Sequence, residues 1–386
     1  MPLRGATILQ VIPHLAAGGA ERTTIEVAEA LVAAGATALV VSVGGRLEKE
    51  LARVGGELIR LETAPTKNPV EIRANANRIA KLVTARKISL IHARSRAPAW
   101  SALWAARQTK IPFVTTYHGV YNAKGSLKRL YNSVMARGAK VIANSDYTAR
   151  HIVQEHPWAA DRIVTIPRGV DIAKFSLEAV APARREALAA AWKIELGVDP
   201  IILLPGRLTG WKGHREAIAA AAALHSGGVS NWRMVFAGDP QGRDGYVAEL
   251  KQLIASAGLD GRVVMVGHCS DMPAAFALSD ITIAPSNEPE AFGRVAAEAG
   301  AMGLPAVGSS IGAQGEIIVD GVTGLIVPPS DPAALSTAIA KLLAMGPDSR
   351  KAMGQKAQAR VLERFTTSAL QKATLSVYEG LLGQAR

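Results

Sequence analysis

The chain has 386 residues, of which 49% are hydrophobic, and its formal net charge is +12. This length and composition suit two ordinary globular domains with sizeable cores, and they exclude a disordered chain. The single cysteine, Cys269, excludes an intrachain disulfide framework and a cysteine-rich metal site, which favours a reducing compartment. Because no run of 18 or more apolar residues occurs, we expect a cytoplasmic protein that is at most peripheral at the inner face of the cytoplasmic membrane.

The positive charge is concentrated in the first half of the chain. Residues 1–170 hold 24 lysines and arginines against 11 aspartates and glutamates, whereas the remainder holds 20 against 21. A basic surface of this kind attracts nucleic acid, anionic lipid or a phosphorylated acceptor. A solvated basic surface without any partner is the alternative interpretation.

Residues 1–170 alternate between strand-like and helix-like segments. The predicted strands are Thr7–Ile12, Ala38–Val43, Leu58–Leu61, Ser89–Ala93, Phe113–Tyr117, Val141–Asn144 and Ile163–Ile166. The predicted helices are Ala20–Ala34, Pro69–Arg86, Ala97–Gln108, Leu127–Ala136 and Asp146–Glu155. Strands that are apolar on both faces belong to sheets covered on both sides, so this alternation predicts a doubly wound parallel sheet.

The regular pattern lapses after Val170, through Ala181–Arg184, and then a second alternating series begins. Its predicted strands are Ile201–Pro205, Met234–Ala237, Val263–Val266, Ile281–Pro285, Pro305–Gly308 and Gly324–Val327. Its predicted helices are His214–Leu224, Tyr246–Ala257, Pro273–Ser279, Gly293–Met302 and Pro332–Leu343, followed by Asp348–Arg364 and Thr367–Leu382. We therefore expect two facing Rossmann-like domains, 1–170 and 183–365, with a ligand cleft between them.

The segment 281–298 places two carboxylates beside a predicted strand end. Glu290 falls in the polar turn after the strand, and Glu298 falls inside the following helix. Loops beyond the carboxyl ends of parallel strands bind ligands, and helix N-termini present free amides to anionic groups. Glu298 could accept hydrogen bonds from a vicinal diol such as ribose, and Glu290 with the amides of residues 292–294 could hold sugar hydroxyls and phosphate. Two solvated glutamates are the alternative, which the apolar and glycine-rich surroundings disfavour.

Two cations follow the first strand of the second domain. Arg207 comes directly after Gly206, and Lys212 lies five residues further on, between Trp211 and Gly213. A guanidinium fork and an ammonium group around one turn can converge on a diphosphate, whose negative charge grows as its bond to carbon breaks. Two solvated surface cations are the alternative.

Three further strand ends carry candidate ligand groups. Gly18 and Gly19 open the first helix, where consecutive glycines let the backbone approach a bound group closely; a plain tight turn is the alternative. His118 ends the fifth strand, where it could hydrogen-bond a hydroxyl or transfer a proton, or it could be structural. Backbone groups at Gly267 and His268 could read the edge of a nucleobase.

Together these motifs resemble a glycosyltransferase of family 4, a retaining family with the GT-B fold, and the resemblance covers nearly the whole chain. The motifs that carry it are Gly18-Gly19-Ala20-Glu21-Arg22, Asn144-Ser145, Pro167-Arg168-Gly169-Val170-Asp171, Gly206-Arg207 with Lys212-Gly213, and Glu290-Ala291-Phe292-Gly293 with Glu298. The Glu-x7-Glu segment is the most specific of them. Ala291 departs from the glycine or proline that relatives often have at this position.

The resemblance implies a role for each matching residue. The implied catalytic residues are His118, Arg207, Lys212 and Glu290, and the implied donor-binding residues are Gly18, Gly19, Gly206, Gly267, His268, Phe292, Gly293, Arg294 and Glu298. Arg207 and Lys212 would hold the donor diphosphate, Glu298 the ribose, and Glu290 with the Phe292 and Gly293 amides the transferred sugar. His118 would contact the sugar near the reacting centre, and Gly18 and Gly19 would line the phosphate side. The final helix, within residues 367–386, would pack back on the first domain.

The implied reaction moves a hexosyl group from a nucleotide-diphosphate sugar to a saccharide or lipid-linked saccharide acceptor, with retention of the anomeric configuration. A UDP-sugar is preferred over a GDP-sugar as donor, and no cofactor or bound metal is expected because the chain contains no Asp-x-Asp pair. The basic first domain would receive the acceptor, in lipopolysaccharide or exopolysaccharide synthesis. The helix predicted at Leu127–Ala136, with Leu127, Leu130, Tyr131 and Val134 on one face, is a candidate membrane-surface helix or an ordinary core-facing one.

Three alternatives are weaker. A GT-B nucleotide-sugar epimerase or hydrolase would keep the fold and change the chemistry. A nicotinamide oxidoreductase would need a Gly-x-Gly-x-x-Gly turn after the first strand, which is absent from the sequence. A nucleic-acid-binding protein would be expected to interleave aromatic residues with its basic residues, and we therefore expect no nucleic-acid partner.

Overall fold

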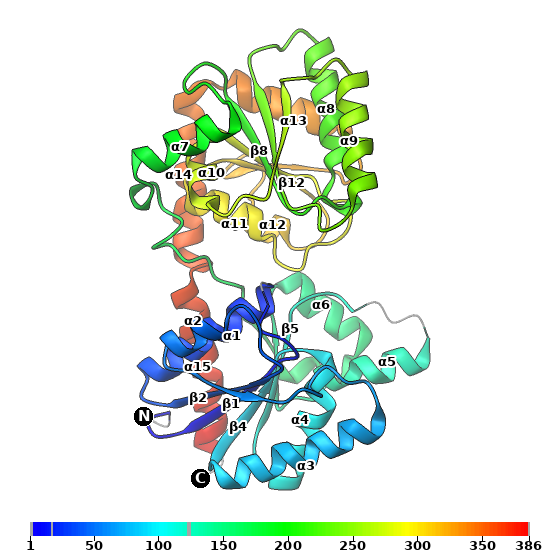
Figure 1. Cartoon of the computed structure of the whole chain (residues 1–386), viewed down its shortest axis with the longest axis vertical. Coiled ribbons are helices and arrows are strands. Elements are labelled where there is room, and N and C mark those ends of the chain that lie inside the picture. Colours follow the sequence, from blue (N-terminus) through cyan, green and yellow to red (C-terminus); the bar gives the residue numbers. More distant parts are fainter. Residues whose placement is uncertain (1–2, 17, 122–124, 385–386) are drawn as a thin grey trace. The chain divides into compact units, whose positions relative to one another are not determined.

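The computed structural model describes residues 3–16, 18–121 and 125–384, which divide into two compact units (Figure 1). Unit 1 comprises residues 1–168 together with 367–386, and unit 2 comprises residues 169–366. Within the described residues, each unit has one parallel sheet, of seven strands in unit 1 and six in unit 2. The α/β class and the two doubly wound sheets predicted from the sequence are confirmed.

The strands of unit 1 lie in the order β3-β2-β1-β4-β5-β6-β7. Their bounds are β1 Thr7–Val11, β2 Thr37–Ser42, β3 Glu57–Arg60, β4 Ile88–Ala93, β5 Phe113–Tyr117, β6 Lys140–Ala143 and β7 Ile163–Thr165. The order reverses between β1 and β4, where consecutive crossovers leave in opposite directions. Parallel sheets bind ligands beyond the carboxyl ends of their strands at such a reversal.

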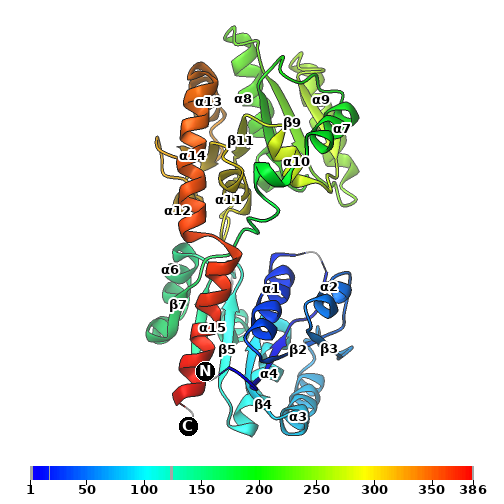
Figure 2. The ribbon, with the colours of Figure 1, turned by 90° about the vertical axis from the view of Figure 1, so that its left-hand side faces the viewer.

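Helices cover both faces of this sheet. They are α1 Gly19–Ala33, α2 Glu48–Arg53, α3 Pro69–Ala85, α4 Arg96–Thr109, α5 Ser126–Asn132, α6 Asp146–Glu155 and α15 Thr367–Gln384, with 3-10 turns at Ser133–Ala136 and Pro157–Arg162. On one face, α3 and α4 pack over a core that includes Val11 and Leu103, and on the other, α1 and α15 pack over Ile8 and Leu31 (Figure 2). Both faces of the strands are therefore dry, which explains why these strands lack polar alternation.

Unit 2 repeats the architecture with the strand order β10-β9-β8-β11-β12-β13. Its strands are β8 Ile201–Pro205, β9 Arg233–Ala237, β10 Val263–Gly267, β11 Ile281–Ala284, β12 Ala306–Ser309 and β13 Gly324–Val327. Its helices are α7 Pro182–Trp192, α8 His214–Ser226, α9 Asp244–Ser256, α10 Met272–Ala277, α11 Arg294–Ala301, α12 Gln314–Ile317, α13 Pro332–Ala344 and α14 Gly346–Arg364, with 3-10 turns at Leu177–Ala179 and Gly210–Lys212. The order reverses between β8 and β11, so the carboxyl ends of these two strands form the expected ligand position.

The last helix, α15, returns to unit 1 although unit 2 precedes it in the chain. The side-chain amide of Gln371 donates a hydrogen bond to the Glu26 carbonyl of α1 over 2.8 Å. Tyr378 is fully buried, and its hydroxyl lies 2.5 Å from Nδ1 of His92 in β4. These contacts attach α15 to both α1 and the sheet, and residues 385–386 lie outside the described ranges.

Several predicted elements differ from the structure. The helix predicted at Leu127–Ala136 is split into α5 and the 3-10 turn Ser133–Ala136, where the Ser133 hydroxyl donates to the Leu130 carbonyl over 2.7 Å and competes with regular helical bonding. The predicted single apolar face is wrong, because Val134 is buried while Leu127 and Leu130 are exposed.

The prediction of an irregular segment through Ala181–Arg184 is also wrong, because α7 begins at Pro182. Proline is favoured in the first turn of a helix, where its missing N–H is not needed. The short helices α2 and α12 were not predicted, since six and four residues are too few to show a periodic pattern.

Candidate active site

The best-defined polar cluster of unit 2 lies where β8 and β11 end. Lys212 occupies the turn between β8 and α8, and Glu290 occupies the loop between β11 and α11. Their side chains form an ion pair in which Nζ lies 2.7 Å from Oε1, with only 13% and 10% of the two side chains exposed. The structure thus brings together two of the predicted catalytic residues at the point of strand reversal.

A serine completes the contacts of the Glu290 carboxylate. The Ser286 hydroxyl donates to Oε1 over 2.5 Å, so both the hydroxyl and the Lys212 ammonium bind the same oxygen. Within the residues that the structure describes, Oε2 of Glu290 receives no hydrogen bond. One carboxylate oxygen therefore orients the side chain, and the other can accept a hydrogen bond from a ligand hydroxyl.

Glycines bring the surrounding loops into backbone contact. Gly213 has φ +78°, and a Cβ added there would overlap the Pro285 carbonyl at the end of β11. Gly312 also has positive φ, and a Cβ there would lie 2.5 Å from both the nitrogen and the carbonyl oxygen of Glu290. The Ala313 amide donates to the same Glu290 carbonyl over 2.8 Å. Only glycine permits these approaches, which fix the backbone on each side of the ion pair.

The two predicted phosphate-binding cations have different surroundings. The ammonium of Lys212 lies 4.3 Å from the centre of the Trp211 ring, and the Trp211 carbonyl accepts a hydrogen bond from the Asn287 amide over 2.8 Å. Arg207, by contrast, is exposed. Lys212 is thus held in place by an aromatic face and a carboxylate, whereas the Arg207 side chain faces solvent.

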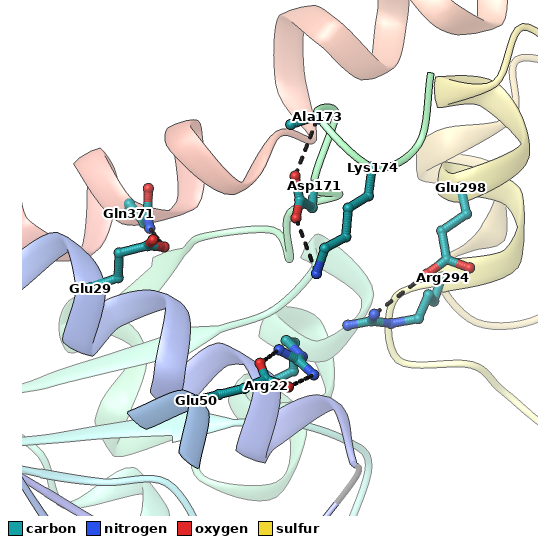
Figure 3. Close-up of polar contacts among 9 residues, drawn as sticks. All are labelled: Arg22, Glu29, Glu50, Asp171, Ala173, Lys174, Arg294, Glu298 and Gln371. Atoms are coloured by element: carbon teal, nitrogen blue, oxygen red, sulfur yellow. Dashed lines mark hydrogen bonds and ion pairs between the residues drawn. The ribbon is translucent and has the colours of Figure 1, made fainter. Parts of the chain in front are cut away.

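Glu298 lies one turn inside α11 and is nearly enclosed. Its Oε1 lies 3.4 Å from Nη1 of Arg294, one turn earlier in the helix, and only 12% of the Glu298 side chain is exposed (Figure 3). Burial raises the pKa of Glu298 to about 7, and the nearby guanidinium of Arg294 only partly opposes this rise. The carboxyl therefore ionises near neutral pH.

Phe292 and Gly293 form the start of α11. The Phe292 ring is buried and packs against Phe365 with ring centres 6.0 Å apart, so it anchors the loop in the core. Gly293 takes φ +88° at the N-cap position, which leaves the first amides of the helix without intrahelical acceptors. Of the amides of residues 292–294 that were predicted to face the donor, that of Arg294 belongs to the first turn of α11, and those of Phe292 and Gly293 lie in the loop before it.

The remaining candidates of unit 2 lie at the ends of β8 and β10. Gly206 follows β8, and a Cβ added at Gly238, after β9, would overlap the Gly206 carbonyl. Gly267 ends β10 with φ +72°, and the His268 side chain beyond it is exposed. Both candidates are thus at carboxyl strand ends: Gly206 at the end of β8, the strand that precedes Lys212, and Gly267 at the end of β10, two strands away from β8.

In unit 1, His118 follows β5 and contacts an arginine that follows β7. One guanidinium nitrogen of Arg168, Nη2, lies 3.2 Å from Nδ1 of His118 and 3.2 Å from its carbonyl oxygen. The pKa of His118 lies well below its usual value because the ring is desolvated and because Arg168 and Arg94 are close. The imidazole is therefore neutral at physiological pH.

Gly18 and Gly19 stand at the N-terminus of α1, as predicted. A Cβ added at Gly19 would overlap the Arg168 guanidinium, whereas a Cβ added at Gly18 would meet only the carboxylate of Glu21. Further along α1, Arg22 is ion-paired with Glu50 of α2 (Figure 3). The helix start and the His118 loop of unit 1 are therefore linked through one arginine.

Three contributing residues were not singled out from the sequence. Ser286 lay within the predicted polar turn, Trp211 beside Lys212, and Arg168 within a quoted motif, but no pattern showed that their side chains reach Glu290, Lys212 and His118. Such contacts depend on loop geometry, which spacing alone does not give. Among the described residues, none of the helices is long and apolar enough to cross a bilayer.

Two doubly wound parallel units with charged groups and glycine turns after their strands are the arrangement expected of glycosyltransferases of the GT-B class. Residues 17–174 match the profile of Glycosyltransferase Family 4, and residues 190–360 match that of Glycosyl transferases group 1. A glycosyltransferase from Rickettsia africae, known from its crystal structure, has a sequence 36% identical to this one. The two structures superpose with a TM-score of 0.91 over 98% of this chain and 99% of that one. The chain belongs to the family 4-like glycosyltransferases of the GT-B fold.

More distant proteins agree with this class. A D-inositol 3-phosphate glycosyltransferase from Acidothermus cellulolyticus is 30% identical over 301 residues, which are 73% of this chain and 65% of that protein. The Anabaena protein HepE, crystallised with UDP and glucose, is 23% identical, with a TM-score of 0.83 over 97% of this chain and 100% of that one. The match to the Acidothermus protein spans slightly less than two thirds of that protein's length, and the match to HepE shows a common fold.

Proposed function

We propose that this glycosyltransferase moves a hexosyl group from a UDP-sugar to a saccharide or lipid-linked saccharide acceptor, with retention of the anomeric configuration. The observation that carries the proposal is the enclosed ion pair between Lys212 and Glu290 at the reversal between β8 and β11. It places a cation suited to a leaving diphosphate next to a carboxylate suited to sugar hydroxyls.

The proposed chemistry breaks one bond and forms one bond at the anomeric carbon. The bond from this carbon to the diphosphate oxygen breaks, and the acceptor oxygen attacks from the same face. The proton of the acceptor hydroxyl passes to the departing phosphate oxygen, so the products are the new glycoside and the nucleoside diphosphate. Lys212, with Arg207, stabilises the negative charge that develops on the leaving group.

The groups around Lys212 and Glu290 bind different parts of the donor. The unpaired Oε2 of Glu290 accepts a hydrogen bond from a hydroxyl of the transferred sugar, while Oε1 stays with Lys212 and Ser286. Glu298 accepts hydrogen bonds from the ribose diol, and the amides after Gly293 bind phosphate oxygens. Backbone groups at Gly206, Gly267 and His268 contact the nucleoside. The choice of UDP is supported by the common fold with HepE, which was crystallised with UDP and glucose.

We propose that the reaction needs no resident metal. The support is the pair of cations, Lys212 and Arg207, which can supply the charge that a divalent ion would otherwise bring to a diphosphate. Activity should then persist after treatment with EDTA. Loss of activity that magnesium or manganese restores would overturn this part of the proposal.

We propose that the acceptor is carried at a membrane surface, in the synthesis of lipopolysaccharide or exopolysaccharide. Helix α5 exposes 83% of Leu127 and 56% of Leu130. Beside them, Leu130, Arg129, Arg137 and Trp158 line a hollow of about 530 Å³. Exposed leucines and tryptophan among arginines are typical of segments that contact anionic lipid. The name of the Acidothermus relative, which gives a phosphorylated acceptor, supports an acceptor that carries phosphate.

A panel of nucleotide diphosphates and nucleotide sugars tests the donor. Thermal stabilisation by UDP and by one UDP-hexose, but not by GDP or its sugars, is the expected result, because a ligand that binds only the folded state raises the unfolding temperature. Transfer is then measured with the selected donor, and the anomeric configuration of the product is read by NMR. An inverted product would overturn retention, and a donor that is consumed equally with and without any acceptor would overturn transfer.

A further inference from the structure

We propose that Arg168 is a positioning residue for His118, because it fixes both the orientation and the tautomer of the imidazole. Residue 19 is then a glycine because the Arg168 guanidinium occupies the space that a larger side chain there would need. The inference rests on the proposed function only in taking His118 as the group that faces the substrate. Neither the sequence motifs nor the similar proteins assign this role to Arg168 or Gly19.

The hydrogen bonds decide the tautomer. A guanidinium has donors and no acceptor, so Nδ1 of His118 must accept the bond from Nη2 of Arg168 and carry no proton. In a neutral ring the proton then resides on Nε2. The second bond of Nη2, to the His118 carbonyl, holds the same guanidinium against the backbone, so the ring cannot turn without losing its partner.

The other ring nitrogen is the one left for a ligand. Nε2 is buried and has no hydrogen-bond partner among the residues that the structure describes. Buried N–H groups in folded proteins nearly always have acceptors, so the unpaired Nε2–H is the ring group that is free to donate to a ligand. An Nε2–H group can donate to a substrate oxygen, whereas the other tautomer would present a lone pair there.

The charged and titratable groups around His118 come from several elements. Arg168 after β7 and Arg94 after β4 are cations that oppose protonation of the ring. His92 in β4 is also buried, and its own pKa is held well below the usual value, so it brings no charge. Tyr121 bonds to the His118 backbone and has a raised pKa, so it is a neutral phenol. Loss of Arg168 removes one of two cations and should raise the pKa of His118.

The glycine beside the arginine provides a second, independent perturbation. Gly18 has an extended backbone and Gly19 is the first residue of α1, so neither has the positive φ that would by itself demand glycine. A methyl group at Gly19 would overlap Nη1 of Arg168, but one at Gly18 would meet only the mobile end of the Glu21 side chain. Gly19→Ala should therefore displace Arg168, and Gly18→Ala should not.

The first experiment needs no substrate. Nitrogen-15 NMR of histidine-labelled protein reports the tautomer of each ring, and the His118→Gln variant identifies the His118 signals among those of the eight histidines. We expect the Nε2–H form in the wild type and in Gly18→Ala, and a mixture of tautomers in Arg168→Met and Gly19→Ala. An unchanged tautomer in both of these variants, or an Nδ1–H form in the wild type, would overturn the proposal.

The second experiment measures turnover against pH with the donor selected by the nucleotide-sugar panel. Arg168→Met should lower kcat about ten- to a hundredfold, as expected for a misplaced catalytic group, and should move the acid limb of the profile to higher pH. Arg168→Lys should keep the acid limb low, because it retains the charge, but should recover kcat only in part. Arg162→Met, at an arginine of the same unit whose side chain is 43% exposed, is the control.

The outcomes separate this inference from the proposed function. One outcome would refute the proposed function and support the positioning role of Arg168. In it, the wild type has no transferase activity but shows the Nε2–H tautomer of His118, and Arg168→Met loses that tautomer. An active Arg168→Met variant with an unshifted profile and an unchanged tautomer would refute the positioning alone. If Arg168→Met does not fold, as judged by circular dichroism, Gly19→Ala decides the question because it retains the arginine.

Discussion

Single residues around the β8–β11 loops carry most of the proposed chemistry. Lys212 is the clearest case, since its ammonium contacts Glu290, and the Trp211 ring limits its movement. The sequence predicted that Lys212 and Glu290 serve one ligand. It could not predict that they contact each other, because the contact depends on close backbone approaches at Gly213 and Gly312 that no spacing rule encodes.

Lys212→Ala should reduce kcat by about a hundred- to a thousandfold, the usual effect of losing one charged group that stabilises a developing anion. Lys212→Arg, which keeps the charge, should lose less. Steady-state kinetics with the selected UDP-sugar would measure both, with unfolding temperatures as the control for structure. Near-normal turnover in the alanine variant would exclude Lys212 from leaving-group stabilisation.

Glu298 gives a prediction about stability and pH. Its pKa of about 7 in the folded protein exceeds the usual 4.5. Between pH 4.5 and 7, the carboxyl is therefore protonated in the folded protein and ionised in the unfolded chain. The free energy of unfolding should therefore fall as pH rises from about 4.5 through 7, by an amount on the order of 2–3 kcal/mol. Glu298→Gln should lack this decrease and be more stable than the wild type at pH 8.

Chemical denaturation of both proteins at pH 5, 6, 7 and 8 would measure the effect as the difference between them at each pH. The comparison cancels the titration of the other groups, which the two proteins share. A difference that does not change with pH would show that Glu298 is ionised throughout and that its surroundings are less desolvated than the structure indicates.

At the scale of elements, regular repeats were predicted well and short or interrupted elements were not. Strand β5 has the predicted bounds, because a continuous run of apolar and β-branched residues is bounded by turn formers. Helix α7 was missed because Pro182 was taken as a break rather than as the first residue of a helix. The helix at α5 was predicted too long, since a serine such as Ser133 can either continue a helix or end it.

Helix α5 provides a test of membrane contact. Leu127→Asp with Leu130→Asp should weaken binding to vesicles that contain anionic lipid by about tenfold or more, because two apolar side chains are lost from the contact. The fold should be retained, since both side chains are largely exposed. Flotation with liposomes measures the effect, and Leu177→Asp, at an exposed leucine of unit 2, is the matched control. Salt-insensitive or absent binding in the wild type would argue against the proposal.

Helix α15 is attached through a buried hydroxyl, which gives another test. Tyr378→Phe removes the group that bonds Nδ1 of His92 and leaves this nitrogen unsatisfied in the core, which should cost about 1–3 kcal/mol. Tyr246→Phe is the matched control, because the Tyr246 hydroxyl is buried without a partner among the described residues. Thermal unfolding of both variants compares them, and equal unfolding temperatures would show that the Tyr378 bond contributes nothing.

At the scale of the whole molecule, the charge asymmetry and the duplicated fold were both accessible from the sequence. The basic half of the chain corresponds largely to unit 1, and the alternating pattern gave two doubly wound sheets. The sequence predicted the residues that follow the strands, since parallel strands bring their carboxyl ends together. It could not predict the side-chain contacts among these loops, such as that between Arg168 and His118, which join segments fifty residues apart.

The return of α15 to unit 1 has a consequence for the order of events during synthesis. The chain completes every strand of unit 1 by Thr165, yet the helix that covers β4 and binds His92 is translated only after the whole of unit 2. The half-finished unit therefore leaves the ribosome with the α15 side of its sheet only partly covered, by α1, and with the polar group of His92 lacking its Tyr378 partner. Unit 2 can fold as soon as residue 366 has emerged, so the unit that is made first should be the one that matures last.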